Sequence, residues 1–472
     1  MVESRQWDLV VIGGGTAGLV ASRTAASFGS RVLLIEEDRL GGDCLWTGCV
    51  PSKSLIAAAS AAATARGSAH LGVTAAEVIV DFAAVMAHVH GAMEAIAPDD
   101  SAESLEQAGV DVMHGRAVFT GEGELEVGGR VIRFRQAFIA TGGSPSIPDV
   151  PGAEEAGILT SSTFWDSTSL PSRLVVLGGG AIGCEIAQAM ARLGSQVTLV
   201  HRGPRILAKE DERAASIVAA AMEADGVTIL LGRSAVSFDG SSATLDDGSA
   251  LEFDAVLAAM GRRSNTVGLG LEAVGVELDE KGNVKVDDRL RTTNPRIWAA
   301  GDVSGLPQFT HTAGVNGSVG ATNAVLGLSR SIDRDAVPRV TFTHPEVGAV
   351  GIRPSDADAH GLRVITIEHH DLDRAICDTE TSGYTSLVVD RRGRIRGGTI
   401  VGPRAGESLG ELGVAVKRGL TASDLAGVTH AYPTYSDGVW KAAVYDVRKR
   451  VVSGAVGRVT GVLHAVRRRR VG

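Results

Sequence analysis

Two cysteines separated by four residues are the part of this 472-residue chain best suited to redox chemistry. Cys44 and Cys49 lie in the segment Gly41–Lys53, which reads GGDCLWTGCVPSK. In an unbroken helix, residues five apart point in different directions, and their Cα atoms lie beyond the roughly 7 Å limit for a disulfide. Gly48 and Pro51 are therefore expected to break the helix and let the two sulfurs meet. The alternative interpretation is two separate buried thiols.

A strand, a glycine-rich turn and a helix precede the two cysteines and are expected to position them. The apolar run Asp8–Ile12 predicts a strand, GGGTAG follows it, and an alanine-rich helix extends to about Phe28. A tight turn, close approach to a pyrophosphate and close helix packing require three glycines, and these are Gly13, Gly15 and Gly18. The next strand, 31–35, ends at Glu36, which is placed to bind an adenosine ribose. Strand, helix and terminal acid together favour a dinucleotide site over a simple tight turn.

A second copy of this pattern follows Pro171. The strand Arg173–Leu177 leads into GGGAIG and a helix through Arg192. The glycines of this second turn are Gly178, Gly180 and Gly183. The next strand, 196–200, ends at His201 and Arg202, where an NAD-preferring site usually carries an acid. Arg202, with Arg205 nearby, is suited to a ribose 2′-phosphate, which favours NADPH over NADH. The alternative is that Arg202 is a solvated charge at a strand end.

The motif around the cysteines resembles that of the flavoprotein disulfide reductases, the group of glutathione reductase, lipoamide dehydrogenase and mercuric reductase. Their motif reads Gly-Gly-x-Cys-x-x-x-x-Gly-Cys-x-Pro-(Ser/Thr/Lys)-Lys, and this chain matches it throughout. The resemblance extends from Asp8 to about Val447. It implies an α/β fold with two Rossmann-like nucleotide-binding domains, one for FAD and one for NADPH, and a C-terminal α+β dimerisation domain.

The order of the motifs predicts the domain plan. The FAD-binding domain occupies 1–150 and 270–336, the NAD(P)H-binding domain 151–269, the dimerisation or interface domain 337–450, and a basic tail 451–472. The segment 341–348, TFTHPEVG, resembles the start of the family's interface domain. The resemblance therefore implies a two-fold homodimer in which each active site is shared between subunits.

The resemblance also assigns roles to single residues. Cys49 is implied to face the flavin and Cys44 to be the interchange thiol that meets the acceptor, with Lys53 and Glu185 paired beside the flavin N5. Asp302 matches the aspartate that binds the ribityl chain. Further positions at the two cofactors are Gly42, Asp43, Ala117, Thr141, Gly142, Gly261 and Ala313. Of these, Thr141, Gly142 and Gly261 lie in the segments 140–143 and 260–262, which resemble the family's two domain-crossing links.

One departure from the family bears on the electron acceptor. Members that act on disulfides carry His-Pro-Thr-x-x-Glu near the C-terminus, whereas this chain has Tyr432 and Asp437 in place of the histidine and glutamate. Histidine titrates at about pH 6.5 and shuttles protons to thiols, while tyrosine, with a pKa of about 10, mostly donates a hydrogen bond. A thiolate-bound metal ion needs soft sulfur ligands rather than a proton shuttle, so a mercuric reductase-like function is favoured. Residues 451–472 nevertheless lack the C-terminal cysteine pair typical of mercuric reductases.

Three alternatives stay open. The first is an NAD(P)H-dependent reductase of a quinone or another small electrophile. The second is a low-molecular-weight disulfide reductase or a dihydrolipoamide dehydrogenase-like enzyme. The third, from a different class, is a catalytically reduced, flavin-bearing redox sensor.

Composition narrows the partners and the location. A net charge of −9 and four cysteines indicate neither a nucleic-acid partner nor a disulfide framework, and no metal site is expected. Without a secretory signal or a membrane-spanning apolar run, the expected location is the cytoplasm. Cys184 and Cys377 are expected to pack as small buried hydrophobes. The basic tail would form an amphipathic helix that touches anionic membrane, but its glycines favour a helix packed on its own dimer, or a frayed end.

Overall fold

The computed structural model describes residues 6–452 and 454–471. The chain divides into two compact units. The first comprises Met1–Gly178, Ala189–Val200 and Ser234–Ile332, and the second comprises Gly179–Gln188, His201–Arg233 and Asp333–Gly472. The limits expected from the sequence for the three domains and the tail stay a prediction.

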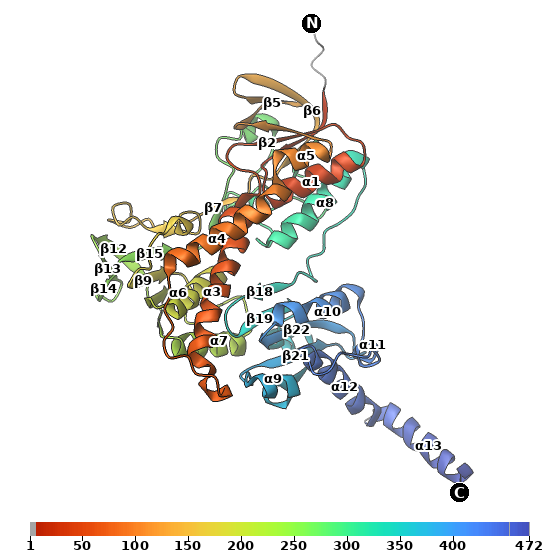
Figure 1. The fold of residues 1–472 in the computed structure, drawn as a ribbon. Coiled ribbons are helices and arrows are strands. Elements are labelled where there is room, and N and C mark those ends of the chain that lie inside the picture. The colour runs from red at the N-terminus through yellow and green to blue at the C-terminus, as the bar shows by residue number, and fades with distance from the viewer. Residues whose placement is uncertain (1–5, 453, 472) are drawn as a thin grey trace. The chain divides into compact units, whose positions relative to one another are not determined.

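The first unit is built on a sheet with the strand order β3-β2-β1-β6-β5-β4, and β17 pairs with β6 on a branch from this order (Figure 1). β1, β2, β3, β6 and β17 pair in parallel, whereas β4, β5 and β6 pair antiparallel. The strands are β1 (Trp7–Ile12), β2 (Val32–Glu36), β3 (Val110–His114), β4 (Ala117–Gly121), β5 (Glu124–Val127), β6 (Arg130–Ile139) and β17 (Ile297–Ala299). The central strands β1 and β2 are mostly apolar and buried, as expected for a sheet covered on both faces.

The helices that lie between these strands in the chain, and the helix after β17, belong to the first unit, and several carry residues of the first nucleotide site. They are α1 (Thr16–Ser27), α2 (Gly42–Trp46), α3 (Cys49–Gly67), α4 (Phe82–Ile96), α5 (Ala102–Gln107) and α8 (Thr310–Leu326). α1 and α8 lie against each other so closely that a Cβ at Gly317 would come within 2.4 Å of the Ala17 carbonyl oxygen. The predicted strand–turn–helix–strand around the first glycine motif is confirmed by β1, α1 and β2.

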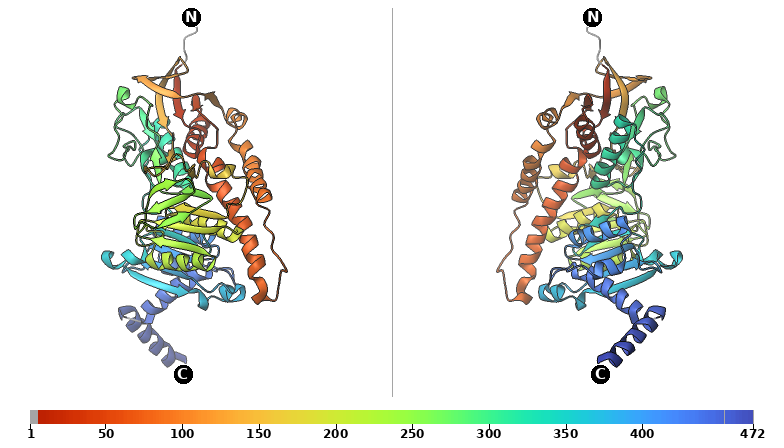
Figure 2. Two further views of the ribbon diagram at one scale, coloured as in Figure 1. Left: turned by 90° about the vertical axis from the view of Figure 1, so that its left-hand side faces the viewer. Right: turned by 90° about the vertical axis from the view of Figure 1, so that its right-hand side faces the viewer.

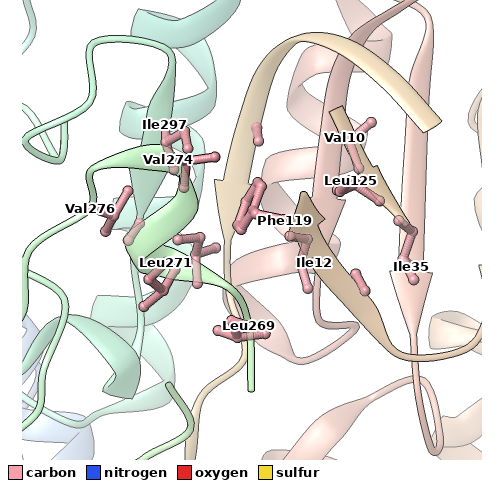
Figure 3. Close-up of a cluster of buried hydrophobic side chains, with 14 of the residues drawn as sticks. Val10, Ile12, Ile35, Phe119, Leu125, Leu269, Leu271, Val274, Val276 and Ile297 are labelled. Carbon is pink, nitrogen blue, oxygen red and sulfur yellow. The ribbon is translucent and has the colours of Figure 1, made fainter. Parts of the chain in front are cut away.

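One buried apolar cluster joins this sheet to a segment far along the chain (Figure 3). Ile12, Phe119 and Leu125 from the sheet meet Leu271 and Ile297, and all five are nearly inaccessible to solvent. Burying a side chain of this size is worth about 1.5–3 kcal/mol. The cluster therefore anchors the returning segment to the sheet that carries the first glycine motif.

A second parallel sheet carries the other glycine motif. In it β10, β9, β15 and β8 lie side by side in this order, and all three pairings are parallel. Their bounds are β10 (Gln196–His201), β9 (Arg173–Leu177), β15 (Ala255–Ala258) and β8 (Leu159–Thr160). The first unit also holds an antiparallel sheet of β12 (Ala235–Asp239), β13 (Ser242–Leu245) and β14 (Ala250–Glu252), and the pair β7 (Gly143–Pro145) and β16 (Arg262–Ser264). α6 (Ala181–Leu193) follows β9, which confirms the predicted second strand and helix.

The second unit contains an antiparallel sheet of five strands in the order β18-β19-β22-β21-β20. Its strands are β18 (Arg339–Thr341), β19 (Glu346–Gly351), β22 (Ile395–Gly402), β21 (Tyr384–Val389) and β20 (Arg363–Glu368). Its helices are α7 (Glu212–Ala224), α9 (Asp373–Asp378), α10 (Ala405–Arg418), α11 (Ala422–Ala426), α12 (Asp437–Val452) and α13 (Gly454–Val471), with β11 (Val227–Leu231) after α7. Leu387, Leu412 and Val439 belong to the cluster that packs the helices on this sheet. The predicted α/β class with a C-terminal α+β part is confirmed.

A buried histidine makes the stability of the second unit depend on pH. His369 is fully buried, its Nε2 lies 3.0 Å from the Thr385 hydroxyl, and burial lowers its pKa from 6.5 to about 4, against the opposing charge of Glu368. The unfolded chain therefore takes up a proton at higher pH than the folded chain. Stability is fully present above pH 6.5 and is lost as the pH falls towards 4, by about 3 kcal/mol for this group.

We therefore expect the free energy of unfolding to fall by about 3 kcal/mol more in the wild type than in His369→Gln between pH 7 and pH 4. Glutamine keeps a polar partner for Thr385 but does not titrate. Urea unfolding at several pH values measures the difference. Parallel pH profiles for the two proteins would contradict the assignment.

Candidate functional site

The two cysteines lie on either side of a break between helices. α2 ends at Trp46 and α3 begins at Cys49, with Gly48 between them at φ −127° and ψ −106°. A Cβ on Gly48 would lie 2.7 Å from the Asp43 carbonyl oxygen, so a larger residue does not fit. The break therefore falls at Gly48, as expected. Pro51 does not contribute to it, because it lies in the first turn of α3, where a proline is tolerated.

The two thiols differ in their surroundings. Cys44 and Cys49 are in the dithiol form. A hydrogen bond to Cys49 and then burial raise the pKa of Cys44, which keeps Cys44 a protonated donor. Cys49 is exposed at the first position of α3, and its Sγ lies 3.2 Å from the Thr310 hydroxyl. The positive end of α3 and this hydroxyl stabilise a thiolate on Cys49.

Lys53 and Glu185 lie in different units, and their predicted pairing stays a prediction. Lys53 is four residues after Cys49 on α3, and its Nζ donates to the Ser52 hydroxyl at 3.3 Å. Glu185 is buried on α6, and its Oε1 accepts from the Phe342 backbone N–H at 2.9 Å. Both side chains have further interactions within the protein.

The first glycine motif forms a cradle of closely packed backbone that leaves no room for side chains at several of its glycines. A Cβ at Gly13 would lie 2.3 Å from the Ala140 carbonyl oxygen, one at Gly18 would lie 1.9 Å from the Gly13 oxygen, and one at Gly42 would lie 2.6 Å from the Gly15 Cα. Among the described residues no side chain caps the N-terminus of α1, so its first N–H groups remain available to an anion.

Glu36 completes this cradle. Its Oε2 accepts from the Gly14 N–H at 2.5 Å and its Oε1 from the Asp38 N–H at 2.8 Å. These bonds fix the carboxylate at the end of β2, beside the glycine turn. The residues present therefore fit the pyrophosphate and ribose of a dinucleotide such as FAD.

An arginine joins two of the predicted flavin residues. Arg262 is only 15% exposed, its Nε lies 2.9 Å from Asp302 Oδ2, and its Nη2 forms an ion pair with Asp43. Burial raises the pKa of Asp302, and the Arg262 charge opposes that rise. No local motif signals this cluster, because Arg262 lies 219 residues after Asp43 and 40 residues before Asp302.

The two segments expected to link domains lie together. β7 and β16 pair antiparallel, with Arg262 opposite Pro145. The Thr141 hydroxyl donates to the Asn265 carbonyl oxygen at 2.7 Å, and the Asn265 amide donates to the Thr141 oxygen at 2.9 Å. Gly142 and Gly261 adopt φ angles of +66° and +123°, which favour glycine.

Two predicted cofactor residues are alanines in regular structure. Ala117 begins β4 and is buried in the apolar cluster that also holds Phe119 and Leu271. Ala313 lies in the first turn of α8, and a Cβ at Gly301, next to Asp302, would lie 3.9 Å from its side chain. Ala313 therefore lies near the predicted ribityl aspartate.

At the second glycine motif a histidine takes the place of the acid. His201 Nδ1 accepts from the Gly179 N–H at 3.1 Å, just as Glu36 accepts from Gly14, and both pairs are 22 residues apart. Burial and the neighbouring Arg202 lower the pKa of His201, which favours the neutral ring that this acceptor role needs.

Arg202 and Arg205, which follow His201, differ in their exposure and hydrogen bonding. Arg202 is exposed. Arg205 instead donates to three carbonyl oxygens of its own loop, those of Leu207 at 3.1 Å, Ala208 at 3.0 Å and Glu210 at 3.2 Å. Of the two, Arg202 is the one available to a ligand.

The other glycines of this motif lie as follows. Gly178 has φ +117°, and a Cβ there would lie 2.3 Å from the Ala259 carbonyl oxygen. A Cβ at Gly180 would meet none of the described atoms within 4 Å, and Gly183 is buried in the first turn of α6. The close approach of the Ala259 carbonyl therefore requires glycine at position 178.

Tyr432 has a partner that the sequence did not predict. It is 68% exposed, and its hydroxyl donates to Asp373 Oδ2 at 2.5 Å, which raises the Tyr432 pKa. Lys441 lies 3.7 Å from Asp373 and 3.4 Å from the buried Asp437. His430 lies two residues before Tyr432, and its Nε2 lies 2.7 Å from Glu411 Oε1. Asp373 precedes Tyr432 by 59 residues, so no local motif signals the contact.

The other two cysteines differ from each other. Cys184 is fully buried, and burial raises its pKa, as expected of a packing residue. The expectation for Cys377 is wrong, because its side chain is exposed on the short helix α9.

The described residues form neither a candidate metal site nor a candidate membrane-spanning helix. No group of three or more His, Cys, Asp or Glu side chains in the described part is arranged to hold a metal ion. None of the helices in residues 6–452 and 454–471 is both long and apolar enough to cross a membrane.

Comparison with known proteins places these features in a family. Residues 7–317 match the model of the pyridine nucleotide-disulphide oxidoreductases, and residues 337–443 match the model of their dimerisation domain. Mercuric reductase from Streptomyces lividans is 35% identical over 93% of this chain and 95% of its own. Dihydrolipoyl dehydrogenase from Geobacillus stearothermophilus is 33% identical over 92% and 95%.

Solved structures agree with this result. LpdA from Mycobacterium tuberculosis has a TM-score of 0.86 at 30% identity. The Cu(II) complex of RclA, an HOCl-induced flavoprotein disulfide reductase from Escherichia coli, has a TM-score of 0.84 at 28% identity. Each comparison covers 93% of this chain and 99% of the other. The chain belongs to the pyridine nucleotide-disulphide oxidoreductase family, whose members combine FAD, a pyridine nucleotide and a C-terminal dimerisation domain.

Proposed function

We propose that this protein is an FAD-dependent oxidoreductase that passes electrons from NADPH through Cys44 and Cys49 to a soft metal ion such as Hg(II). When bound, FAD supplies the two-electron chemistry between the nucleotide and the thiols. The observation that carries the choice of acceptor is the exposed Tyr432, whose hydroxyl is held by Asp373.

The two thiols are suited to this transfer. Oxidation of the Cys44 thiol and the Cys49 thiolate to a disulfide releases two electrons and one proton, and two electrons reduce Hg(II) to the metal. Soft sulfur ligands also bind such an ion before it is reduced. Neither step requires a proton donor at a leaving thiol.

Tyr432 argues against a disulfide acceptor. Reduction of a disulfide must deliver a proton to the departing thiol, a task suited to a group that titrates near neutrality. The hydrogen bond to Asp373 raises the Tyr432 pKa further above neutrality, so the phenol stays protonated. Tyr432 therefore acts as a fixed hydrogen-bond donor rather than a proton shuttle.

The relatives support both leading candidates. Several are named mercuric reductase, and one neighbouring structure holds Cu(II), which favours a metal ion. Others are named dihydrolipoyl dehydrogenase at similar identity, which keeps a dithiol or disulfide substrate as the second candidate. Two further alternatives are a reductase of a quinone or another small electrophile, and a redox sensor with diminished catalysis. The experiment below tests both.

The test is NADPH oxidation by the FAD-loaded protein with Hg(II) and excess thiol, with a quinone, and with a panel of disulfides and dihydrolipoamide. Wild type and Cys44→Ser are compared for each acceptor. Rapid Hg(II)-dependent turnover that the substitution abolishes supports the proposal. Quinone turnover that survives it, or faster turnover with a disulfide, overturns the choice of acceptor, and no turnover with any acceptor supports the sensor.

We also propose a preference for NADPH over NADH and a two-fold homodimer in the cytoplasm. The exposed Arg202 beside a neutral His201 supports the nucleotide preference, because an arginine pairs with a 2′-phosphate and no carboxylate stands there to repel it. The dimerisation-domain match supports the dimer. In such a dimer Tyr432 serves the active site of the partner subunit.

We expect Arg202→Glu to lower kcat/KM for NADPH roughly a hundredfold, because a charge-assisted contact worth about 1.5–3 kcal/mol is lost and a repulsion is added. The value for NADH should change by less than about threefold, because NADH has no 2′-phosphate. Steady-state kinetics with both nucleotides measures the ratio. An equal loss for NADH would mean that Arg202 serves the fold rather than the phosphate.

A further inference from the structure

The C-terminal helix α13 presents an unpartnered apolar stripe. Val459, Val462, Leu463 and Val466 recur at the spacing of one helix face and are between 45% and 63% exposed. Large apolar side chains in such a row are rarely left in water without a partner. The stripe therefore indicates that a lipid surface or another molecule covers this face of α13.

The same segment carries many positive charges and no negative side chain. Residues 447–472 hold eight Lys and Arg and no Asp or Glu, in a chain whose net charge is −9. With 3.6 residues per turn, Arg458 and Arg469 flank the stripe on one side and Arg467 on the other, each about 90° from its centre. Arginines at these positions extend their charged ends away from an apolar layer while their stems lie along it.

Contacts between α12 and α13 leave the stripe uncovered. The Thr460 hydroxyl, on a different face of α13, donates to the Val451 carbonyl oxygen at 3.3 Å, and a Cβ at Gly457 would lie 2.4 Å from the Val452 oxygen. α13 extends away from the sheet of its own unit (Figures 1 and 2). These contacts with α12 lie in the first half of α13.

The tail is also additional to the family architecture. The dimerisation-domain match ends at residue 443, and the solved relatives are covered over 99% of their own chains while covering 93% of this one. The family models therefore do not extend to α13.

We propose that α13 is a surface anchor that lies on an anionic lipid bilayer. Val459, Val462, Leu463 and Val466 enter the boundary between headgroups and acyl chains, and the flanking arginines contact lipid phosphates. Self-association of two α13 helices would bring like charges together with no acid to pair them. A nucleic acid would use the arginines but would leave the apolar stripe in water.

The test is flotation of the full-length, FAD-loaded protein with vesicles of phosphatidylglycerol and phosphatidylcholine, compared with phosphatidylcholine alone. We expect binding only to the anionic vesicles and release by high salt. Leu463→Asp should lower the partition coefficient at least about tenfold, because it places a charge within the stripe. Replacing Arg467, Arg468 and Arg469 by glutamine should lower it by a similar factor.

The matched control is Gly461→Asp. It adds the same charge on the opposite face of α13, where a Cβ would meet none of the described atoms within 4 Å. Retained binding by this variant supports the proposal. Equal loss in Gly461→Asp and Leu463→Asp, binding to uncharged vesicles, or a Leu463-dependent increase in molecular mass in sedimentation without vesicles overturns it, and so does tight binding of duplex DNA without vesicle binding.

Discussion

Replacing Cys49 by serine is expected to reduce NADPH-dependent turnover at least about a thousandfold, because the hydroxyl can neither form the bond to Cys44 nor ionise at the start of α3. The loss follows from the geometry of the pair. A hydrogen bond to Cys49 raises the pKa of Cys44, and the Thr310 hydroxyl lies 3.2 Å from the Cys49 sulfur. Steady-state NADPH oxidation with Hg(II) and excess thiol, together with the FAD content of the purified protein, measures the effect.

Cys377→Ser is the matched control for this substitution. Cys377 is also an exposed thiol, but it lies on α9 and has no place in the proposed electron path. We expect it to retain wild-type turnover and Cys49→Ser to retain wild-type FAD content. Turnover above about a tenth of wild type in Cys49→Ser would exclude the dithiol route.

Gly18→Ala is expected to prevent FAD binding and to destabilise the first unit by at least about 3 kcal/mol. The added Cβ would lie 1.9 Å from the Gly13 carbonyl oxygen, and a backbone atom in a tight turn has no room to move aside. In an ordinary helix the same change stabilises by about 1 kcal/mol, so the clash decides the sign. FAD absorbance and thermal unfolding of the purified protein report the two effects.

Gly67→Ala supplies the comparison. Gly67 is the last residue of α3, and a Cβ there would meet no atom of the described residues within 4 Å. We expect full FAD content and an unchanged or slightly higher melting temperature. If Gly18→Ala behaved in the same way, the close approach of α1 to the glycine turn would not be needed for the cofactor site.

Features encoded within a few residues could be predicted from the sequence. The glycine turns, the strands on either side of them, Glu36 and the helix break at Gly48 all depend on neighbours in the chain, since φ preference and apolar runs act locally. The misassigned Pro51 shows the limit of such reasoning. A proline in the first turn of a helix and one that breaks a helix look alike until the first helical residue is known.

Contacts between distant residues could not be predicted in this way. Tyr432 meets Asp373 across 59 positions, and Arg262 meets Asp43 across 219. Nothing in the local sequence signals such a pair, because the fold alone brings the two side chains together. The same reasoning explains Cys377, whose exposure depends on how α9 packs rather than on the cysteine itself.

The pairing of β7 with β16 determines how the fold responds to a change in the length of the segment between these strands. Pro145 and Arg262 lie opposite each other in an antiparallel pair. The segment 146–261 is therefore the connection between the two strands of a β-hairpin. Loop-closure entropy grows only slowly with loop length, so a long connection costs little more than a short one. The length of the segment between these strands therefore has little effect on the register of the hairpin, or on the position of Arg262 at its edge.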